Sequence, residues 1–100
     1  MQSANKFECN KDKARSNFQK HGLRFTEGCR IFDGHTLTVE SNNNSSIEEK
    51  RFVSIGVLDE QIAAVVVWTN RSGNIRVISV RKASRKERES YNAYIKKQVN

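Results

Sequence analysis

The sequence predicts an α+β fold in which two amino-terminal helices pack on an antiparallel meander sheet of about four strands, closed by a carboxy-terminal helix. Three observations support this class. The spacing of apolar residues changes from helical to alternating at Thr36. The segment Gln61–Thr69 is apolar on both faces, as expected for a central strand. Beyond the strand Ile75–Lys82, Ser84 and Glu87 form a capping box that begins a new helix.

The first helix is expected to start after the N-cap Asn10 and to run to Lys20 or His21, following a short extended piece at 7–9. Gly22 should end it in the left-handed conformation. Ala14 and Phe18 lie four residues apart and predict its inner face, with His21 on the same side.

The second helix is expected to be short, with Thr26 as its N-cap and Asp33-Gly34 as its end. Its inner face is predicted from the helical spacing of Phe25, Cys29 and Phe32.

The strands are expected to follow one another along the chain. The first begins at Thr36 and gives way to a mobile polar loop at Ser41–Ser46. Arg51–Leu58 alternates, and the turn Asn70–Asn74, with Gly73, returns the chain antiparallel into Ile75–Lys82. The final helix should extend to about Gln98, and its inner stripe is predicted to contain Arg88, Tyr91, Tyr94 or Ile95, and Gln98.

Length and composition indicate one domain spanning residues 1–100. The longest apolar run, Ile62–Trp68, is too short to cross a membrane, and the amino end has no secretory pattern, so a cytoplasmic protein is expected.

Cys9 and Cys29 have neither metal-ligand spacing nor a disulfide pattern, and two reduced, partly buried thiols are expected.

Charge is distributed unevenly along the chain. Residues 1–70 contain nine basic and nine acidic side chains, whereas residues 71–100 contain nine basic and two acidic ones. The whole net charge of +7 therefore comes from the last thirty residues. Such an asymmetry is typical of a surface that binds a polyanion, although a solvated basic helix without a ligand is the alternative.

The carboxylates do not cluster and no glycine-rich loop is present, so the sequence favours neither a two-metal nuclease nor a nucleotide-binding site, and no cofactor is expected. A metal-free ribonuclease requires a base for the 2′-hydroxyl and cations for the developing phosphate charge. His21 suits the base, but a histidine at a helix end is commonly a packed or capping residue. Glu49 is a second candidate base, or the salt-bridge partner of Arg51. Two roles are open for Tyr91: its hydroxyl donates a hydrogen bond to a phosphate, or its ring packs in the core.

The sequence resembles the BrnT family over Phe7 to about Tyr91. The resemblance rests on two segments in this order, Lys20-His21-Gly22 with Phe25 and Ile75-Arg76-Val77-Ile78-Ser79 with Arg81, and on the following matches around them: Phe7-Glu8, Lys13, Asn17, Phe32-Asp33, Glu49, Arg51-Phe52, Ile55-Gly56, Thr69, Arg71, Ala83 and Arg85 to Arg88. Cys9-Asn10 stands where that family usually has Trp-Asp, and Trp68 where a histidine is frequent.

The resemblance implies a RelE-like fold and a ribonuclease toxin of a type II toxin-antitoxin system that cleaves RNA and inhibits translation. It also implies neutralisation by a BrnA-like ribbon-helix-helix antitoxin, through which DNA is contacted. No membrane partner is expected. Two other classes stay open, a nucleic-acid-binding module without catalysis and a protein-interaction domain with a basic face.

Strict alternation along Ile75–Lys82 predicts that Arg81 shares a face with Ile75, Val77 and Ser79, and that Arg76 and Lys82 share the other with Ile78 and Val80. Charge placement and the resemblance together favour Arg51, Arg81 and Arg85 as the main phosphate ligands, with Glu49 or His21 as the proton acceptor. The wider set of expected RNA-binding residues is Lys20, Arg71, Arg76, Lys82, Arg85, Arg88 and Tyr91.

Overall fold

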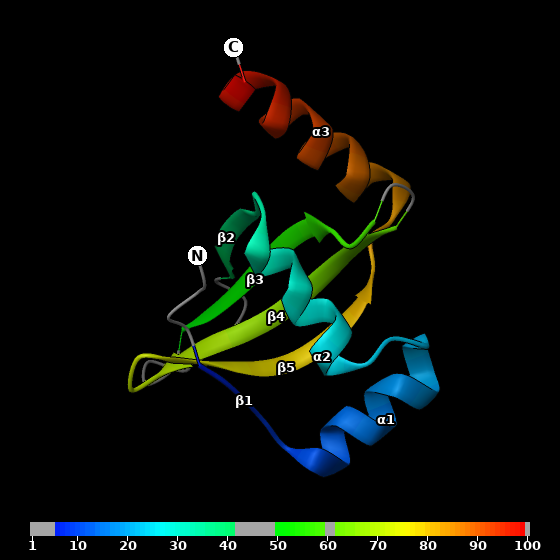
Figure 1. The fold of residues 1–100 in the computed structure, drawn as a ribbon, viewed down its shortest axis with the longest axis vertical. Coiled ribbons are helices and arrows are strands. Elements are labelled where there is room, and N and C mark those ends of the chain that lie inside the picture. The colour runs from blue at the N-terminus through cyan, green and yellow to red at the C-terminus, as the bar shows by residue number, and fades with distance from the viewer. Residues whose placement is uncertain (1–5, 42–49, 60–61, 100) are drawn as a thin grey trace.

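The computed structural model describes residues 6–41, 50–59 and 62–99. The elements along the chain are β1 (Phe7–Cys9), α1 (Lys11–His21), α2 (Phe25–Gly28), the 3-10 helix η1 (Cys29–Asp33), β2 (Leu37–Ser41), β3 (Arg51–Val57), β4 (Ala63–Arg71), β5 (Asn74–Lys82) and α3 (Arg85–Val99) (Figure 1). The predicted α+β class is confirmed. The predicted loop Ser41–Ser46 lies, apart from Ser41, outside the described residues.

The sheet has five strands in the described part of the chain, in the order β1-β5-β4-β3-β2, where about four were predicted. β2 to β5 form the predicted antiparallel meander with β4 at its centre. The additional strand is β1, which pairs in parallel with the first half of β5. Three residues carry too little pattern to predict a strand partner, so the parallel edge was not expected.

The turn between β4 and β5 is a two-residue hairpin loop at Ser72 and Gly73. Both residues have positive φ angles, 55° and 86°. This backbone matches the right-handed twist of the flanking strands, and Gly73 adopts it without steric cost. The Gly73 amide also donates to Asn70 Oδ1 at 3.1 Å, so the predicted turn is confirmed.

A β-bulge in β5 decides which way the following side chains point. Val77 pairs with Trp68 and Ser79 pairs with Val67, so Ile78 has no pairing partner in β4. This stretch of β5 thus holds one residue more than the stretch of β4 that it faces. The alternation of side chains is therefore reset after Ile78.

The bulge brings Arg76 to the same side of the sheet as Arg81. The prediction from strict alternation, which placed Arg76 with Val80 and Arg81 with Ile75 and Val77, is therefore wrong on both points. We call one side the arginine face, which the strand register assigns to Arg51, Val53, Ile55, Val65, Val67, Thr69, Arg76, Ser79 and Arg81. The other side is the helix face, with Phe52, Ser54, Gly56, Ala64, Val66, Trp68, Ile75, Val77 and Val80.

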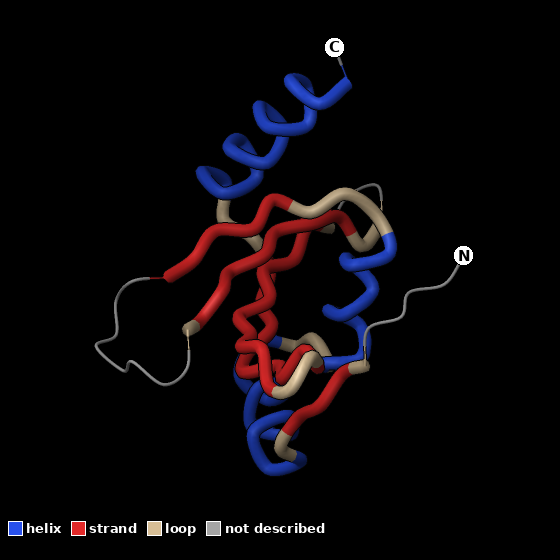
Figure 2. Tube along the Cα trace, turned by 90° about the vertical axis from the view of Figure 1, so that its left-hand side faces the viewer, coloured by secondary structure: helices blue, strands red, loops and turns tan. Residues whose placement is uncertain are grey.

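The main core lies between the helix face and the amino-terminal helices (Figure 2). Phe25 of α2, Ile31 of η1 and Leu23 of the connection between α1 and α2 contribute to it from the helix layer. The helices approach closely because Gly28 lies against Val80, where an added Cβ would sit 2.5 Å from a Val80 methyl. The buried members of this core are Leu23, Phe25, Ile31, Ala64, Val66, Ile75, Val77 and Val80.

The ends of α1 are confirmed, and its predicted inner face is confirmed only for Ala14, which packs against the main core, whereas Phe18 and His21 are exposed. Asn10 Oδ1 accepts hydrogen bonds from the amides of Asp12 and Lys13, and Gly22 has a φ of 74°. Phe18, predicted to face inward, is 41% exposed and lies under the Arg24 guanidinium. The buried residue of α1 is Asn17.

Asn17 joins α1 to the edge of β5. Its side-chain amide donates to the carbonyl of Val80 at 2.8 Å and accepts from the amide of Val80 at 3.1 Å. It also donates to the carbonyl of Leu23 at 3.2 Å. Since β1 pairs with β5 only as far as Val77, the Asn17 amide takes the place of a neighbouring strand for Val80.

The second helix begins earlier than predicted. Arg24 precedes it and its amide donates to Glu27 Oε1 at 2.7 Å, while Thr26, the predicted cap, is exposed inside the helix. The predicted Phe25 is buried, but the most buried side chain of the region is Ile31, because the chain tightens into a 3-10 helix after Gly28.

α3 packs on the opposite side of the sheet and projects away from it (Figures 1 and 2). Tyr91 is its buried anchor and packs with Ile55 and Val65 in a second, smaller core. The predicted inner stripe is confirmed for Tyr91 and, in part, for Tyr94 and Ile95, whereas Arg88 and Gln98 are exposed.

The start of α3 is the predicted capping box. The Ser84 amide donates to Glu87 Oε1 at 2.8 Å, and the Glu87 amide donates to Ser84 Oγ at 3.2 Å.

Ser84→Ala should therefore lower the free energy of unfolding by about 1 kcal/mol, as measured by urea unfolding. Ser90→Ala, an exposed site within the same helix, is the matched control and should be neutral or slightly stabilising. Equal stabilities for the two variants would contradict the capping role.

Candidate functional site

Two arginines on the arginine face flank one residue of the central strand. Arg51 of β3 and Arg76 of β5 both pair with Thr69 of β4, one from each side. Their Cα atoms are therefore two strand spacings apart, about 10 Å. Guanidinium groups on side chains of this length can converge above Thr69, where a phosphate would accept from both.

Glu8 extends this row onto β1, where the parallel register places it beside Arg76. A Glu8 carboxylate oxygen lies 3.6 Å from an Arg76 guanidinium nitrogen, and the other accepts from Asn74 Nδ2 at 2.6 Å. Both Glu8 and Arg76 keep about a third of their side-chain surface exposed. A carboxylate thus stands next to a cation on the arginine face.

Glu8 is among the residues that carry the family resemblance but was not a predicted site residue, and neither was Asn74. Glu8 lies far from Arg76 along the chain and stands in a three-residue strand with no strong pattern. The only available signal was its alternation with Phe7 and Cys9, which puts it on the opposite side of an extended chain from these two apolar residues.

The other end of the arginine face lies under the start of α3. Arg81 donates to both carboxylate oxygens of Glu87, at 2.8 and 2.7 Å. The hydrogen bonds from Arg81 are the largest cause that lowers the pKa of Glu87 to about 2; the Ser84 hydrogen bonds lower it further, whereas desolvation opposes the shift. Arg81, predicted as a main phosphate ligand, is therefore engaged in holding α3 to β5.

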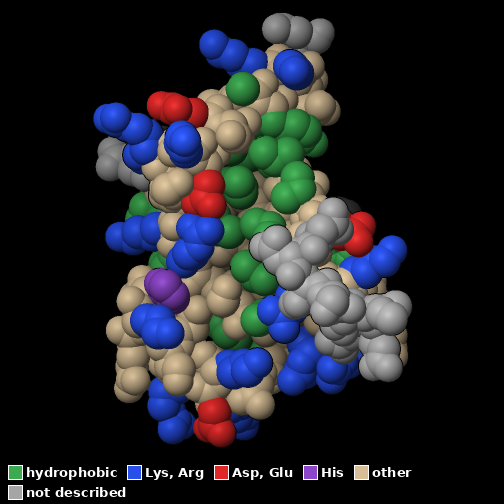
Figure 3. Space-filling view, turned by 180° about the vertical axis from the view of Figure 1, so that it is seen from behind, with side chains coloured by type: hydrophobic (Ala, Val, Ile, Leu, Met, Phe, Trp, Pro, Cys, Tyr) green, Lys and Arg blue, Asp and Glu red, His purple; other side chains and the backbone are tan. Residues whose placement is uncertain are grey.

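Between these two ends the arginine face carries half-buried Val53, Val67 and Ser79. Figure 3 shows this side of the molecule, with hydrophobic side chains along its middle and Lys and Arg side chains around them. Such an arrangement offers apolar contact area with cations at its margin.

Lys20 and His21 are brought to a different place. They line a pocket of about 350 Å³ between α1 and the bulged part of β5, together with Lys13, Ser16 and Ser79. Ser79 also belongs to the arginine face by register, so this pocket adjoins that face at its β5 edge.

The remaining predicted residues are scattered. Arg71 ends β4 at the hairpin, and Lys82, Arg85 and Arg88 are exposed around the start of α3.

Tyr91 is 7% exposed and its hydroxyl donates to the His35 carbonyl at 2.9 Å, which supports the packing interpretation. Burial is also the main cause that raises the pKa of Tyr91. Glu49 lies outside the described residues.

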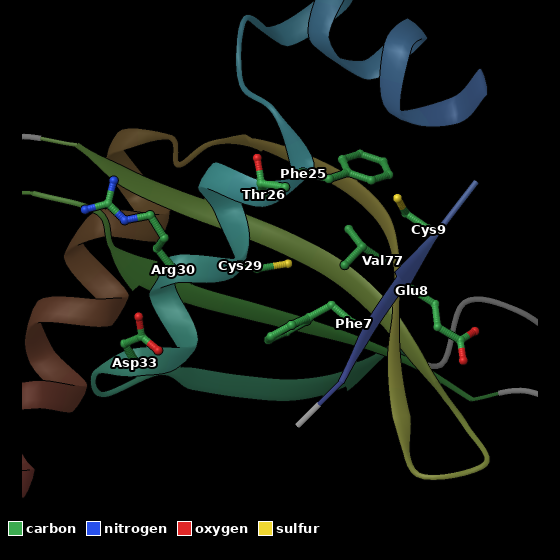
Figure 4. Close-up of a pocket in the computed structure, with 9 residues that line it drawn as sticks. All are labelled: Phe7, Glu8, Cys9, Phe25, Thr26, Cys29, Arg30, Asp33 and Val77. Carbon is green, nitrogen blue, oxygen red and sulfur yellow. The ribbon is translucent and has the colours of Figure 1, made fainter. Parts of the chain in front are cut away.

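A second pocket of about 340 Å³ opens on the helix-face side, between β1 and the helices α2 and η1. Figure 4 shows Phe7 and Val77 directed into it, whereas Glu8 points away on the other side of β1. Both cysteines line it and both are free thiols. Burial, with a smaller effect from Cys9, raises the pKa of Cys29 to about 12, so this thiol stays protonated and is a poor nucleophile.

Two features are absent from the part of the chain that the structure describes. No three His, Cys, Asp or Glu side chains in it lie close enough together to hold a metal ion. None of its helices is long and apolar enough to cross a membrane.

A basic face on an α+β scaffold, with two arginines beside a carboxylate, has the charge that anionic ligands such as phosphate groups require. Residues 10–87 match the family described as "Ribonuclease toxin, BrnT, of type II toxin-antitoxin system", and the chain belongs to this family. The matched segment ends at Glu87, so β1 precedes it and most of α3 follows it.

The fold is also that of a solved structure. The crystal structure of the Brucella abortus ribonuclease toxin BrnT aligns with a TM-score of 0.66 and 24% sequence identity, over 82% of this chain and 100% of that chain. No curated protein sequence matches this chain.

Proposed function

We propose that this member of the ribonuclease toxin family is a metal-independent endoribonuclease whose reaction centre is the row Glu8, Arg76 and Arg51. The observation that carries the proposal is the pairing of both arginines with Thr69, which lets them hold one phosphate, with Glu8 beside Arg76. Cations that stabilise the developing charge and a base that takes one proton are what RNA cleavage requires.

In the proposed reaction, Glu8 accepts the proton of the ribose 2′-hydroxyl. The 2′-oxygen then forms a bond to the adjacent phosphorus, and the bond from phosphorus to the 5′-oxygen of the next nucleotide breaks. Arg51 and Arg76 stabilise the charge that develops on the non-bridging oxygens. The leaving 5′-oxygen takes a proton from water, and the hydroxide that remains takes the proton from Glu8, so the carboxylate is restored and the products end in a 2′,3′-cyclic phosphate and a 5′-hydroxyl.

The Glu8–Arg76 ion pair is compatible with this role. Its separation of 3.6 Å is longer than that of the Arg81–Glu87 pair at 2.7 Å, and it is about a third exposed. A phosphate that bound Arg76 would compete with the carboxylate for the guanidinium and leave Glu8 free to accept a proton. His21, the alternative base, lines the pocket beside α1 and not this row.

The proposed setting is the bacterial cytoplasm, where cleavage of RNA inhibits translation. The proposed partner is a BrnA-like ribbon-helix-helix antitoxin that covers the arginine face and contacts DNA on behalf of the complex. The positive margin of this face suits an acidic segment of such a partner.

The test is RNA cleavage by the purified chain in excess EDTA, with the ends of the products identified by mass spectrometry. We expect cleavage with 2′,3′-cyclic phosphate ends. Retention of RNA without cleavage would identify a binding module, and cleavage only after Mg²⁺ addition would contradict metal independence. In a bacterial host, expression should arrest growth, and co-expression of the adjacent small reading frame should restore it.

A further inference from the structure

The pocket between α1 and β5 has a composition that the proposed reaction centre does not use. Lys13 and Lys20 lie seven residues apart on one stripe of α1, with Ser16 between them and His21 at the helix end. All four side chains are exposed. The two ammonium groups, the imidazole and the hydroxyl can all direct hydrogen-bond donors into one space of about 350 Å³.

The opposite wall of the pocket is the bulged edge of β5, with Ile78 and Ser79. This edge is accessible because β1 pairs with β5 only as far as Val77 and α1 then runs beside it. Asn17 fixes α1 in place through its two hydrogen bonds to Val80, so the pocket walls are held by a buried contact. The spacing between the lysines and β5 is therefore built into the fold.

The pocket is also continuous with the arginine face. Ser79 lines the pocket and lies three residues from Arg76 along β5, about 10 Å at the rise of a strand. A nucleic-acid strand that placed one phosphate above Thr69 could follow β5 past Ser79 toward the lysines. Among the described residues that line the pocket, Asp12 is the one acidic side chain, so cationic groups outnumber it.

We propose that this pocket is a phosphate-binding subsite for the RNA strand, which holds a phosphate next to the one that is cut. The inference rests on the proposed ribonuclease function and adds a role for Lys13, Lys20 and His21, which bind and position the strand and take no part in bond cleavage. Charge-assisted hydrogen bonds from the two lysines supply the affinity for the phosphate. Ser79 lies where the RNA strand would pass from the reaction centre to the pocket.

The test uses a fluorescent octanucleotide of 2′-O-methyl RNA, which has no 2′-hydroxyl and is not cleaved. Lys13→Ala/Lys20→Ala should weaken its binding by on the order of tenfold, as expected when a charge-assisted hydrogen bond is removed. The slope of log affinity against log salt should become shallower by about 0.7, the value for one fewer neutralised phosphate on a single strand. With cleavable RNA, KM should rise while kcat stays unchanged.

The matched control is Lys96→Ala/Lys97→Ala, which removes the same charge from exposed positions near the end of α3. Its affinity and salt slope should stay close to those of the unmodified chain. In NMR spectra of ¹⁵N-labelled protein, the octanucleotide should shift the amide signals of Ser16 and Ser79, and these shifts should shrink in the pocket variant.

The inference is overturned if the two double variants bind alike, if the octanucleotide does not bind, or if the signals of Ser16 and Ser79 do not move. A fall in kcat at constant KM would place the lysines in the reaction itself and would also overturn it. The binding and NMR measurements decide the subsite even for a chain that cuts no RNA, so failure of the proposed cleavage is seen separately.

Discussion

Asn17→Ala should lower the free energy of unfolding by roughly 3–5 kcal/mol, because it leaves several buried backbone groups without hydrogen-bond partners. The Asn17 side chain bonds the amide and the carbonyl of Val80 and the carbonyl of Leu23. Val80 is 0% exposed and Leu23 6%, so water does not readily replace these bonds. A decrease of this size is a large fraction of the roughly 5–15 kcal/mol by which domains are ordinarily stable.

The measurement is urea unfolding followed by circular dichroism, with Gln19→Ala as the matched control on the exposed side of the same helix. The control should stay within about 0.5 kcal/mol of the unmodified chain. Asn17→Asp separates the donors from the acceptor, since it keeps an oxygen for the Val80 amide but removes both bonds that the amide nitrogen donates. A decrease below about 1 kcal/mol for Asn17→Ala would mean that Val80 finds other partners.

Arg51→Ala and Arg76→Ala should each reduce kcat for RNA cleavage by on the order of 10²–10³-fold, because each removes a preorganised cation from the reacting phosphate. The two flank Thr69 from opposite strands, so neither is expected to replace the other. Glu8→Gln should reduce kcat by about 10²–10⁴-fold, the usual contribution of a general base, while an amide oxygen remains to accept from Asn74.

Single-turnover cleavage of a labelled RNA measures these effects, and circular dichroism checks that the variants fold. Lys96→Ala, near the far end of α3, removes one exposed charge and should leave kcat unchanged. Arg81→Ala is expected to act differently, because it removes the ion pair with Glu87 and makes α3 less stable. Full activity of a folded Arg51→Ala/Arg76→Ala double variant would exclude this row as the reaction centre.

Local signals in the sequence determined most of the secondary structure. Asn10, Gly22 and the Ser84–Glu87 pair act within one or two turns of chain, so their geometry follows from the residues themselves. The same holds for Gly73 in its hairpin and for the apolar residues of β4, which any antiparallel meander would place at its centre. The excess of positive charge near the carboxy end was likewise visible, and the BrnT resemblance agreed with it.

Only the tertiary structure decided how the candidate site is assembled. Because of the bulge at Ile78, Arg76 lies on the side of the sheet opposite to the one that strict alternation predicts. No single residue in β5 indicates a bulge. The parallel pairing of β1 brought Glu8 beside Arg76, and Glu87 engaged Arg81. Each of these contacts depends on strand register or on the docking of α3. Periodicity states which side chains share a face of one element, but the pairing of elements determines which faces meet.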